Sequence, residues 1–179
     1  MNTRPTTDKV KEAIFSMIGP YFDGGIALDL FAGTGALGIE ALSRGVDRAV
    51  FIDADRRAVS VVRRNAEAAR VADRAEIYCN TADRALRMLA KRGAVFRYVF
   101  LDPPYRMKIA DTLMAEMAER GMLEDGAVVV VEHEADHAYP ETVGGLARRR
   151  LATYGETAVS IYHYDRAAGA AEEETDEGS

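Results

Sequence analysis

The chain has little cysteine and no long apolar run. Its single cysteine, Cys79, cannot form a disulfide within the chain, so a small secreted protein held together by disulfides is excluded. No apolar run approaches the roughly 20 residues that a membrane-spanning helix requires, and residues 1–15 lack the apolar core and cleavage site of a secretory signal. We therefore expect a cytoplasmic protein without membrane association. Cys79 lies in an apolar, strand-like run and is expected to be a small buried side chain.

The balance of charge is acidic, but the acids are concentrated at one end. The formal net charge is −6. Residues 166–179 contain one arginine and five acidic residues, so the remainder of the chain carries only −2. Within that remainder lie four basic clusters, at Arg56–Arg57, Arg63–Arg64, Lys91–Arg92 and Arg148–Arg150. A local basic face is compatible with an acidic total, so a nucleic-acid partner is not excluded. Each cluster is equally explained as a solvated helix or strand surface.

Strand-like and helix-like segments alternate along residues 26–133. The strand-like runs are short and apolar, as expected of strands buried on both faces of a sheet, and the helix-like runs are amphipathic. A further helix is expected at 6–22, capped by Thr6 or Thr7. This alternation predicts a doubly wound α/β sheet with crossover helices on both faces. The strands are expected at 26–31, 48–53, 75–80 and 127–133, with a further strand in 98–105 that runs into a proline loop. The helices between them are expected at 36–44, 56–71, 82–93 and 108–121.

The pattern changes after residue 145. Two strand-like runs flank Tyr154–Glu156 with no helix between them, which predicts an antiparallel hairpin. Residues 166–179 have few large apolar side chains and a high charge, which is typical of disorder. We therefore expect one domain over residues 1–165, with a mostly parallel sheet that ends in a hairpin, followed by a disordered acidic tail at 166–179.

A glycine-rich turn follows the first expected strand. Residues 29–42, DLFAGTGALGIEAL, place Gly33, Gly35 and Gly38 in the spacing G-x-G-x-x-G. Such glycines let the backbone approach a ligand and adopt positive φ, and the helix that follows presents a partial positive charge. Asp53 ends the next strand, where a carboxylate can accept both hydroxyls of an adenosine ribose. The turn predicts a nicotinamide dinucleotide or another adenosine-containing cofactor; a purely structural turn, with Asp53 as a helix cap, is the alternative.

Two features distinguish the candidate cofactors. Asp29 lies in the strand just before the turn, where a nicotinamide cofactor would place its pyrophosphate. A carboxylate is a poor neighbour for phosphate, but it suits the ammonium and sulfonium groups of S-adenosylmethionine. The second feature is DPPY, Asp102 to Tyr105, at the carboxyl end of the fourth strand, which is where open α/β sheets bind ligands. Both features favour S-adenosylmethionine as the cofactor, and we expect no metal.

The DPPY loop is suited to holding an amine. Asp102 accepts hydrogen bonds, Pro103 has no N–H, and Pro104 restricts the backbone. The loop can therefore direct acceptors at an exocyclic NH₂ group without competing donors and leave the nitrogen lone pair exposed. Tyr105 offers a flat face on which a base can stack. An amine held in this way can attack a methyl sulfonium in line, so the loop predicts a methyltransferase that acts on a nucleobase.

Three segments together resemble one protein family. TRPTTDKVKEAIFSMIG, LDLFAGTGALGIEALSRG and LDPPY are similar to the RsmD family of bacterial small-subunit ribosomal RNA guanine-N2 methyltransferases, in particular to members from Gram-positive bacilli. The resemblance extends from about Arg4 to Tyr164. It implies a class I methyltransferase fold, Rossmann-like, with a seven-stranded sheet in the order 3-2-1-4-5-7-6. It also implies S-adenosylmethionine as methyl donor and the exocyclic N2 of a guanine in 16S ribosomal RNA as acceptor.

The resemblance also implies roles for individual residues. Asp29, Gly33 and Gly35 would surround the methionine part of the cofactor, Asp53 would hold the ribose, and Asp83 would approach the adenine amino group. The resemblance further implies that Phe31 and Thr7 would contact the cofactor. The target-base site would consist of Asp102, Pro103, Pro104 and Tyr105, with Arg4, Tyr105 and Arg106 as substrate residues.

Ribosomal RNA, or a partly assembled small ribosomal subunit, is the expected partner of a monomeric protein. Three alternatives remain open. The first alternative is a DNA or RNA methyltransferase that acts on adenine N6 or on another exocyclic amine, because the DPPY loop does not itself specify guanine. A nucleotide-binding oxidoreductase is disfavoured by Asp29 and by DPPY. A non-catalytic RNA-binding or assembly protein is disfavoured by the complete cofactor pocket.

Overall fold

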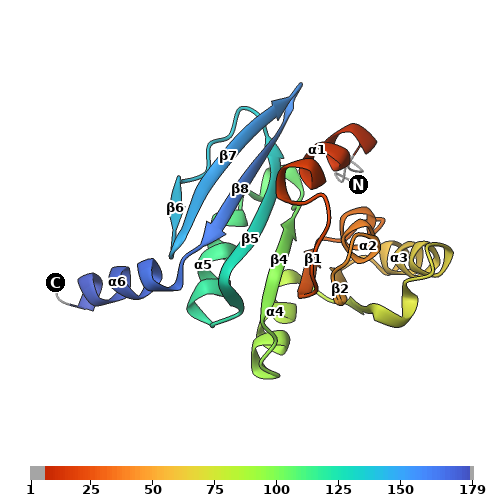
Figure 1. The fold of residues 1–179 in the computed structure, drawn as a ribbon, viewed down its shortest axis with the longest axis horizontal. Helices are drawn as coiled ribbons and strands as arrows, with labels where there is room; N and C mark the ends of the chain where they lie inside the picture. Colours follow the sequence, from red (N-terminus) through yellow and green to blue (C-terminus); the bar gives the residue numbers. More distant parts are fainter. Residues whose placement is uncertain (1–6, 178–179) are drawn as a thin grey trace.

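The computed structural model describes residues 7–177, which form one mixed sheet flanked by helices (Figure 1). The strands are β1 (Ile26–Leu30), β2 (Arg48–Asp53), β3 (Ala75–Cys79), β4 (Phe96–Leu101), β5 (Leu123–Glu134), β6 (Thr142–Val143), β7 (Leu146–Tyr154) and β8 (Thr157–Tyr164). The helices are α1 (Asp8–Ile18), α2 (Ala36–Ser43), α3 (Arg56–Ala68), α4 (Ala82–Lys91), α5 (Ala110–Glu119) and α6 (Arg166–Glu177), with short 3-10 helices at Ala72–Arg74 and Tyr105–Met107.

The strand order is β3-β2-β1-β4-β5-β8-β7-β6. Because β7 and β8 are the two strands of the expected hairpin, the predicted fold class and the predicted order of seven strands are confirmed. β6 is an additional edge strand of two residues, which is too short for a sequence pattern to reveal. The sheet of the described residues therefore has eight strands instead of seven.

The first five strands run parallel to one another. β1 pairs with β2 on one side and with β4 on the other, and β3 and β5 extend the sheet outward. The chain thus builds the sheet in one direction as far as β3 and then continues from β4 in the other. The reversal lies between β1 and β4, whose last residues, Leu30 and Leu101, are direct neighbours. This is the switch point at which such sheets bind ligands.

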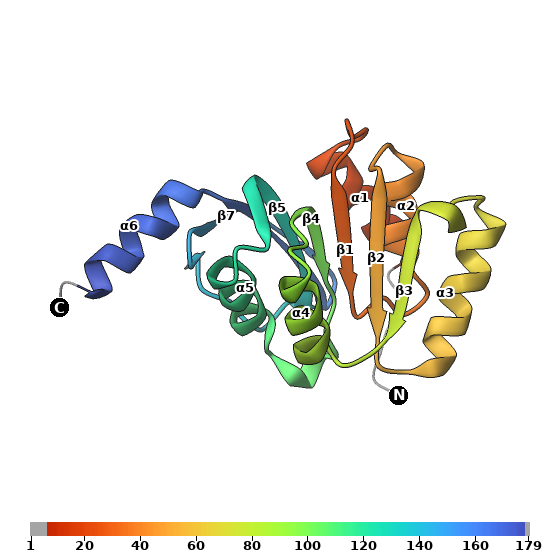
Figure 2. The same ribbon diagram turned by 90° about the horizontal axis from the view of Figure 1, so that it is seen from below.

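Helices cover the two faces of the sheet in separate groups (Figure 2). α1, α2 and α3 pack on one face, and α4 and α5 on the other, so the central strands are buried on both sides as their apolar runs predict. Phe15 of α1, for example, packs on Phe100 of β4 with ring centroids 5.8 Å apart. No helix in residues 7–177 is long and apolar enough to cross a membrane.

The expected hairpin is present and joins the sheet antiparallel. β8 pairs with β5, so that Ile161 lies opposite Val130, and β7 pairs with β8 on the outside. The hydroxyl of Tyr162 donates to the carbonyl oxygen of Pro140 at 2.6 Å, which ties β8 to the segment before β6. The hairpin is therefore a continuation of the main sheet and not a separate subdomain.

Residues 166–177 form helix α6, so the expectation of disorder does not hold for them. Asp165 precedes the helix, and its Oδ1 accepts the N–H groups of Ala167 and Ala168 at 3.0 and 3.4 Å. This N-cap and the high helix propensity of the alanine and glutamate residues that follow stabilise the helix, although the segment has few large apolar residues. α6 projects away from the rest of the molecule (Figures 1 and 2). The division into a domain over 1–165 and an acidic tail stays a prediction.

Cys79 is exposed, so the prediction that it is buried is wrong. β3 lies at the edge of the sheet, and Cys79 is its last residue, so only one neighbouring strand adjoins it. Its Sγ lies 3.5 Å from the carbonyl oxygen of Ala54. An apolar run does not distinguish an edge strand from a central one, and this is the reason for the error.

Candidate cofactor site and target-base loop

Two loops meet at the switch point of the sheet. Residues 31–35 follow β1, and Asp102–Pro104 follows β4. Since Leu30 and Leu101 are neighbours in the sheet, the predicted cofactor turn and the predicted base loop begin side by side. The carboxyl end of β2, with Asp53, adjoins β1 on its other side. The topology therefore brings together the three chain segments that the sequence singled out.

The turn after β1 has an unusual backbone. Phe31, Gly33 and Gly35 all have positive φ, at 75°, 59° and 80°. Positive φ is uncommon for a bulky residue such as phenylalanine, and the N–H of Phe31 donates to the carbonyl oxygen of Ile52 at 3.0 Å, which holds it in place. The result is a tight turn that directs the chain from β1 into α2.

The glycines of the turn differ in their surroundings. A Cβ atom added at Gly33 would have no atom within 4 Å, so the space beside this backbone is open. A Cβ atom at Gly38 would lie 2.4 Å from the ring of Phe51, so this glycine is needed for α2 to pack against β2. Gly33 therefore leaves room for a ligand, whereas Gly38 serves the packing of the fold.

Asp29 is buried in β1, with 2% of the residue exposed. Its Oδ2 accepts the N–H of Gly38, in the first turn of α2, at 2.9 Å. Burial raises the pKa of this carboxyl group to about 7, although the Gly38 N–H opposes the rise; the negative charge of Asp53 adds to it. A nearby cation would favour the ionised form, so the position suits an ammonium or sulfonium group and not a phosphate.

Asp53 connects two turns. Its Oδ2 accepts the N–H of Gly33 at 2.9 Å, and its Oδ1 accepts the N–H of Asp55 at 2.9 Å. The cap of α3 is Asp55, whose Oδ1 accepts the N–H of Arg57 at 2.9 Å, so helix capping does not account for Asp53. Each carboxylate oxygen can accept a second hydrogen bond, and Asp53 is only half-buried. It can therefore still accept two hydroxyl groups.

Asp83 and Thr7, two further predicted cofactor residues, each interact with a residue of their own helix. Asp83 is exposed in the first turn of α4, with its Oδ2 3.6 Å from a guanidinium nitrogen of Arg87. A hydrogen bond from Thr81 is the main cause that lowers the pKa of Asp83. Thr7 caps α1 through its side-chain oxygen. Contacts of Asp83 and Thr7 with a cofactor stay predictions, and Arg4 lies outside the described residues.

The DPPY loop is anchored at both of its ends. Pro103 is buried, and Asp102 and Tyr105 are half-buried. The hydroxyl of Tyr105 lies 2.9 Å from Oγ1 of Thr157, the first residue of β8, so the tyrosine is held against the hairpin. Arg106 is exposed directly after it. The loop is thus positioned by β4 on one side and by β8 on the other.

Sequence reasoning missed a small pocket beside this loop. It lies between the DPPY loop and the carboxyl end of β5, and its lining is polar on the β5 side. A signal was present, because the apolar run of β5 ends in the polar residues Glu132–Glu134, just as the neighbouring β4 ends in Asp102. The lining residues are Pro103, Pro104, Tyr105, Lys108, Glu132, His133, Glu134, His137 and Tyr139.

His133 in this pocket forms a hydrogen bond through each of its ring nitrogens. Its Nδ1 lies 2.8 Å from the carbonyl oxygen of Glu134, and its Nε2 lies 2.8 Å from Oγ of Ser160. A carbonyl oxygen can only accept, so Nδ1 carries the proton and Nε2 accepts from the serine hydroxyl. Burial is the main cause that lowers the pKa of His133. The ring therefore fastens the end of β5 to β8.

Together the two loops form a site with two chemically different sides. The side at β1 and β2 presents buried and half-buried carboxylates beside an open backbone turn. The side at β4 presents a proline-containing loop rich in hydrogen-bond acceptors. Among the described residues, no group of histidine, cysteine and acidic side chains is arranged to bind a metal ion. The arrangement can hold a cationic adenosine cofactor on one side and an amine on the other.

Comparison with known sequences places the chain among ribosomal RNA methyltransferases. The model of a family described as conserved hypothetical protein 95 matches residues 1–163. YlbH of Bacillus subtilis, a candidate rRNA methyltransferase, is 52% identical over 161 residues, which cover 90% of this chain and 88% of that protein. Ribosomal RNA small subunit methyltransferase D of Escherichia coli K12 is 32% identical over 159 residues, which cover 89% of this chain and 78% of that protein.

Solved structures agree with this assignment. A conserved hypothetical protein of Streptococcus pyogenes aligns with a TM-score of 0.83 at 35% identity, over 87% of this chain and 96% of that one. An RNA methyltransferase of Salinibacter ruber, in complex with S-adenosyl-L-homocysteine, aligns with a TM-score of 0.66 at 21% identity, over 90% and 94% of the two chains, and supports the fold alone. The chain therefore belongs to the family of conserved hypothetical protein 95, the RsmD family of small-subunit ribosomal RNA methyltransferases.

Proposed function

We propose that this protein transfers a methyl group from S-adenosylmethionine to the exocyclic N2 of a guanine in 16S ribosomal RNA. The observation that carries the proposal is the placement of the acid-flanked turn directly beside the DPPY loop at the switch point. The E. coli relative is named as a methyltransferase of small-subunit ribosomal RNA. A nicotinamide-dependent oxidoreductase is disfavoured because Asp29 is buried at the position where a pyrophosphate would lie.

The residues of the turn fit S-adenosylmethionine. The open space beside Gly33 admits a ligand close to the backbone, and the buried carboxyl group of Asp29 suits the positive charge of the methionine part. Asp53 keeps two acceptor positions for the ribose hydroxyls, since the N–H groups of Gly33 and Asp55 use only one on each oxygen. When bound, the cofactor supplies an electrophilic methyl group that needs no further activation by the protein.

The DPPY loop then positions the nucleophile. Asp102 and the backbone carbonyl groups accept the hydrogens of the guanine N2 amine and leave its lone pair free on the cofactor side. In the transfer step the C–N bond would form, the bond between the methyl carbon and the sulfonium sulfur would break with S-adenosylhomocysteine as the leaving group, and N2 would gain positive charge. The Asp102 carboxylate would stabilise this charge and accept the proton that leaves. Catalysis rests on orientation and charge stabilisation. A base stacked in a duplex is out of reach, so the target guanine has to be unpaired or flipped out.

The identity of the acceptor atom is tested by analysing the product. Purified protein is incubated with labelled S-adenosylmethionine and small-subunit ribosomal RNA from a strain that lacks the gene, and the RNA is then digested to nucleosides. We expect N2-methylguanosine at one position. N6-methyladenosine, or transfer to DNA instead of RNA, would favour the broader class of exocyclic-amine methyltransferases. An Asp102→Ala protein serves as the control for transfer that does not depend on the loop.

We further propose that the protein acts in the cytoplasm as a monomer, on naked ribosomal RNA or on a partly assembled small subunit. Transfer rates to naked RNA, to assembly intermediates and to complete subunits, measured side by side, identify the preferred form. Light scattering of the purified protein gives its oligomeric state, and a dimer at assay concentrations would contradict this part of the proposal.

A further inference from the structure

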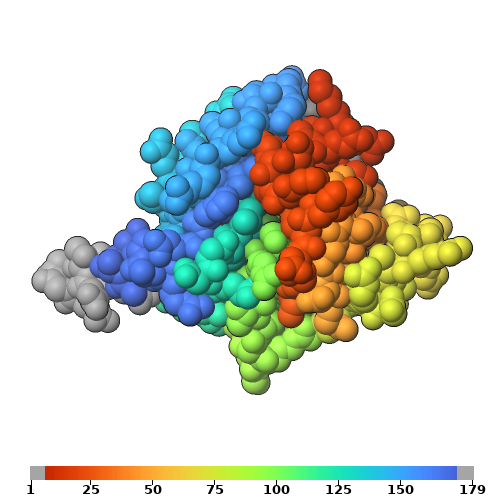
Figure 3. Space-filling view, in the orientation of Figure 1, coloured from red at the N-terminus to blue at the C-terminus, as the bar shows by residue number. Residues whose placement is uncertain are grey.

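One face of the β7–β8 hairpin is covered over the middle of β8, where Val159 and Ile161 are buried, but has no helix over β7 (Figure 3). α1, α2 and α3 cover the corresponding face of the parallel part of the sheet, whereas β7 packs mainly on its neighbours β8 and β6. In the space-filling view this face of the hairpin is at the molecular surface beside α1 (Figures 1 and 3). Val159 and Ile161 of β8 belong to the same face, because they pack in the core that α1, α2 and α3 cover.

A bulge places two consecutive arginines on this uncovered face. Arg148 lies opposite Tyr162 and Arg150 opposite Ile161, so Arg149 is the additional residue of β7. Arg150 therefore shares the face of Ile161. Arg149 lies near the exposed His163, whose pKa is lowered by partial burial and, second, by the charge of Arg149. Without the bulge, two neighbouring strand residues would point to opposite faces.

The two arginines differ from Arg148, their neighbour in the sequence. Arg148 turns to the other side, where its guanidinium donates to the carbonyl oxygen of Tyr139 at 3.3 Å and lies 3.8 Å from Glu141. Arg149 and Arg150 are exposed and form no ion pair with another residue of the described part. Within residues 7–177, the hairpin thus carries two guanidinium groups that no ion pair neutralises, and a surface of this kind is complementary to phosphate.

The arginines of β7 lie within a short distance of the target-base loop. Tyr105 of that loop bonds to Thr157, the first residue of β8. Ile161, which lies opposite Arg150, is four residues further along β8, or roughly 13 Å at the usual rise of a strand. A base held at Tyr105 and a phosphate at Arg150 would therefore be separated by only a few nucleotides of the same RNA strand.

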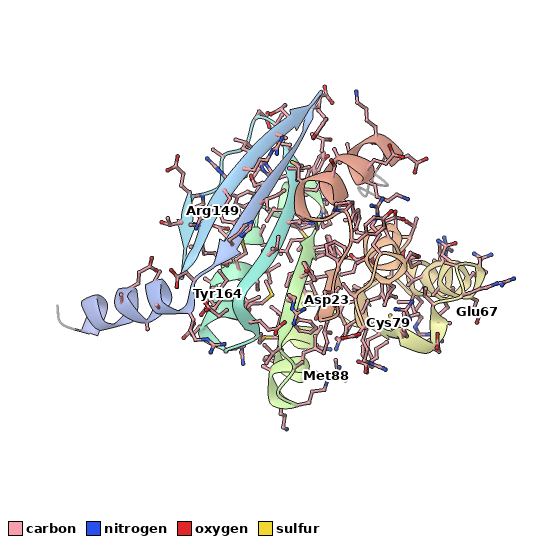
Figure 4. The ribbon with its side chains drawn as sticks, viewed as in Figure 1. Asp23, Glu67, Cys79, Met88, Arg149 and Tyr164 are labelled. Carbon is pink, nitrogen blue, oxygen red and sulfur yellow. The ribbon has the colours of Figure 1, made fainter. Side chains whose placement is uncertain are left out.

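We infer that the bulged, uncovered β7 part of this hairpin face is the surface on which the RNA backbone beside the target base docks, with Arg149 and Arg150 contacting phosphates. The inference rests on the proposed function, because it takes the DPPY loop as the place of the target base. α3 offers the rival surface, with the exposed residues Arg56, Arg57, Arg63 and Arg64. Arg149 and Glu67 of α3 lie on opposite sides of the molecule (Figure 4), and it is the hairpin, through Thr157, that contacts the DPPY loop.

The experiment compares two matched double variants. Arg149→Ala with Arg150→Ala removes two charges from the hairpin, and Arg63→Ala with Arg64→Ala removes two charges from α3. A third protein, with lysine at positions 149 and 150, keeps the charge of the hairpin. Binding of an unmodified transcript of 16S ribosomal RNA is measured at several salt concentrations, together with affinity for S-adenosylmethionine, the melting temperature, and KM and kcat for methyl transfer.

We expect the hairpin double variant to bind the transcript about 10-fold more weakly at low salt. The slope of its salt dependence should fall by about 1.4, because each single-strand phosphate that the protein neutralises contributes roughly 0.7 to that slope. KM for RNA should rise, while kcat at saturating RNA, cofactor affinity and melting temperature stay unchanged. The α3 variant should stay close to the unmodified protein. The lysine variant should retain most of the salt slope and thereby separate loss of charge from loss of fold.

Wild-type affinity and slope in the hairpin variant would overturn the inference, as would an equal or larger loss in the α3 variant. Failure of the unmodified protein to bind the transcript would overturn it as well. The binding comparison requires no methyl transfer. If the transcript is bound through the hairpin but no guanine is methylated, the proposed function fails while the docking surface stands.

Discussion

The two ends of the sheet carry out different tasks with different structures. From β3 to β4 the strands are parallel and covered by helices on both faces, and the functional groups are acids whose oxygens accept backbone N–H groups of neighbouring turns. From β5 to β7 the strands are antiparallel, and the uncovered β7 side of the hairpin carries two arginines that form no ion pair with another described residue. The first end is organised around a small cationic ligand, and the second around a long polyanion.

This difference predicts that the two tasks can be separated by mutation. The carboxylates of β1 and β2 should control cofactor affinity and the stability of the ligand-free protein. The DPPY loop lies at the boundary and should control the transfer step, while the hairpin should control only RNA binding. Each of the following changes addresses one of these regions, beginning with the largest expected effect.

Asp29→Asn should change stability and cofactor binding in opposite directions. The carboxyl group has a pKa of about 7 in the folded protein and an ordinary value of 3.8. As the pH rises from about 4 to about 7, the unfolded chain loses this proton before the folded chain does, so the folded state is progressively destabilised. The cost at pH 8 is up to ~4 kcal/mol. Asparagine does not ionise and should remove most of this cost.

Chemical denaturation of the ligand-free proteins at pH 5, 6, 7 and 8 measures this effect. The gain in stability of the Asp29→Asn protein over the original should widen across that range, while its affinity for S-adenosylmethionine should fall because the buried negative charge is absent. A stability difference that stays constant with pH would show that Asp29 does not titrate in this window.

Asp102→Ala should abolish most methyl transfer and leave cofactor binding nearly unchanged. The reason is that Asp102 would hold the target amine, whose position matters only at the transfer step. Loss of one positioned polar group should cost about 3 kcal/mol, or more than about 100-fold in rate. Asn at this position should be less harmful, since its amide oxygen still accepts a hydrogen bond. The test is to measure single-turnover methyl transfer at saturating S-adenosylmethionine, and the affinity for S-adenosylmethionine, for each variant. Near-normal transfer by the alanine variant would refute the mechanism.

Asp53→Ala should weaken S-adenosylmethionine binding by one to two orders of magnitude, since the loss of charge-assisted hydrogen bonds costs roughly 1.5–3 kcal/mol. Asp55→Ala is a matched control, because Asp55 lies two residues away and caps α3. The control should lose about 1 kcal/mol of stability and little cofactor affinity. Calorimetry that shows equal affinities for the Asp53→Ala and unmodified proteins would exclude Asp53 from the site.

The sequence alone predicts the parallel end well, and the reasons are local. Glycine spacing, a carboxylate at a strand end and a proline loop are each visible in a few consecutive residues, and the order of strands brings them together. The polar end of β5 was harder to interpret. Glu132 and His133 line the pocket beside the DPPY loop because of how β5 pairs with β4 and β8, and this pairing is not visible in the sequence.

The antiparallel end depends more strongly on tertiary structure. The bulge at Arg149 follows from how β7 pairs with β8, and no pattern in residues 146–154 indicates which arginine is the additional residue.

Two other errors lie outside the hairpin. Cys79 is exposed because β3 has a neighbour on only one side, which the run AEIYC does not reveal. The helix at α6 was missed for a different reason, since charge and low apolar content were weighed above the helix propensity of alanine and glutamate.

Removal of residues 166–179 should have the smallest effect on stability and should change RNA binding through charge alone. α6 is joined to the domain by a hydrogen bond from the Arg166 N–H to Asp125 at 3.0 Å and by close packing of Gly169 on Gly145. Loss of these interactions should cost about 1 kcal/mol or less.

Because the removed segment carries a net charge of −4, RNA affinity should rise at low salt and return to normal at high salt. A full-length protein in which the five acids of this segment are replaced by amides is the matched control, and it should show the same gain. Thermal melts and salt titrations of both proteins test the argument; a large loss of stability on truncation would show that α6 is an integral part of the domain.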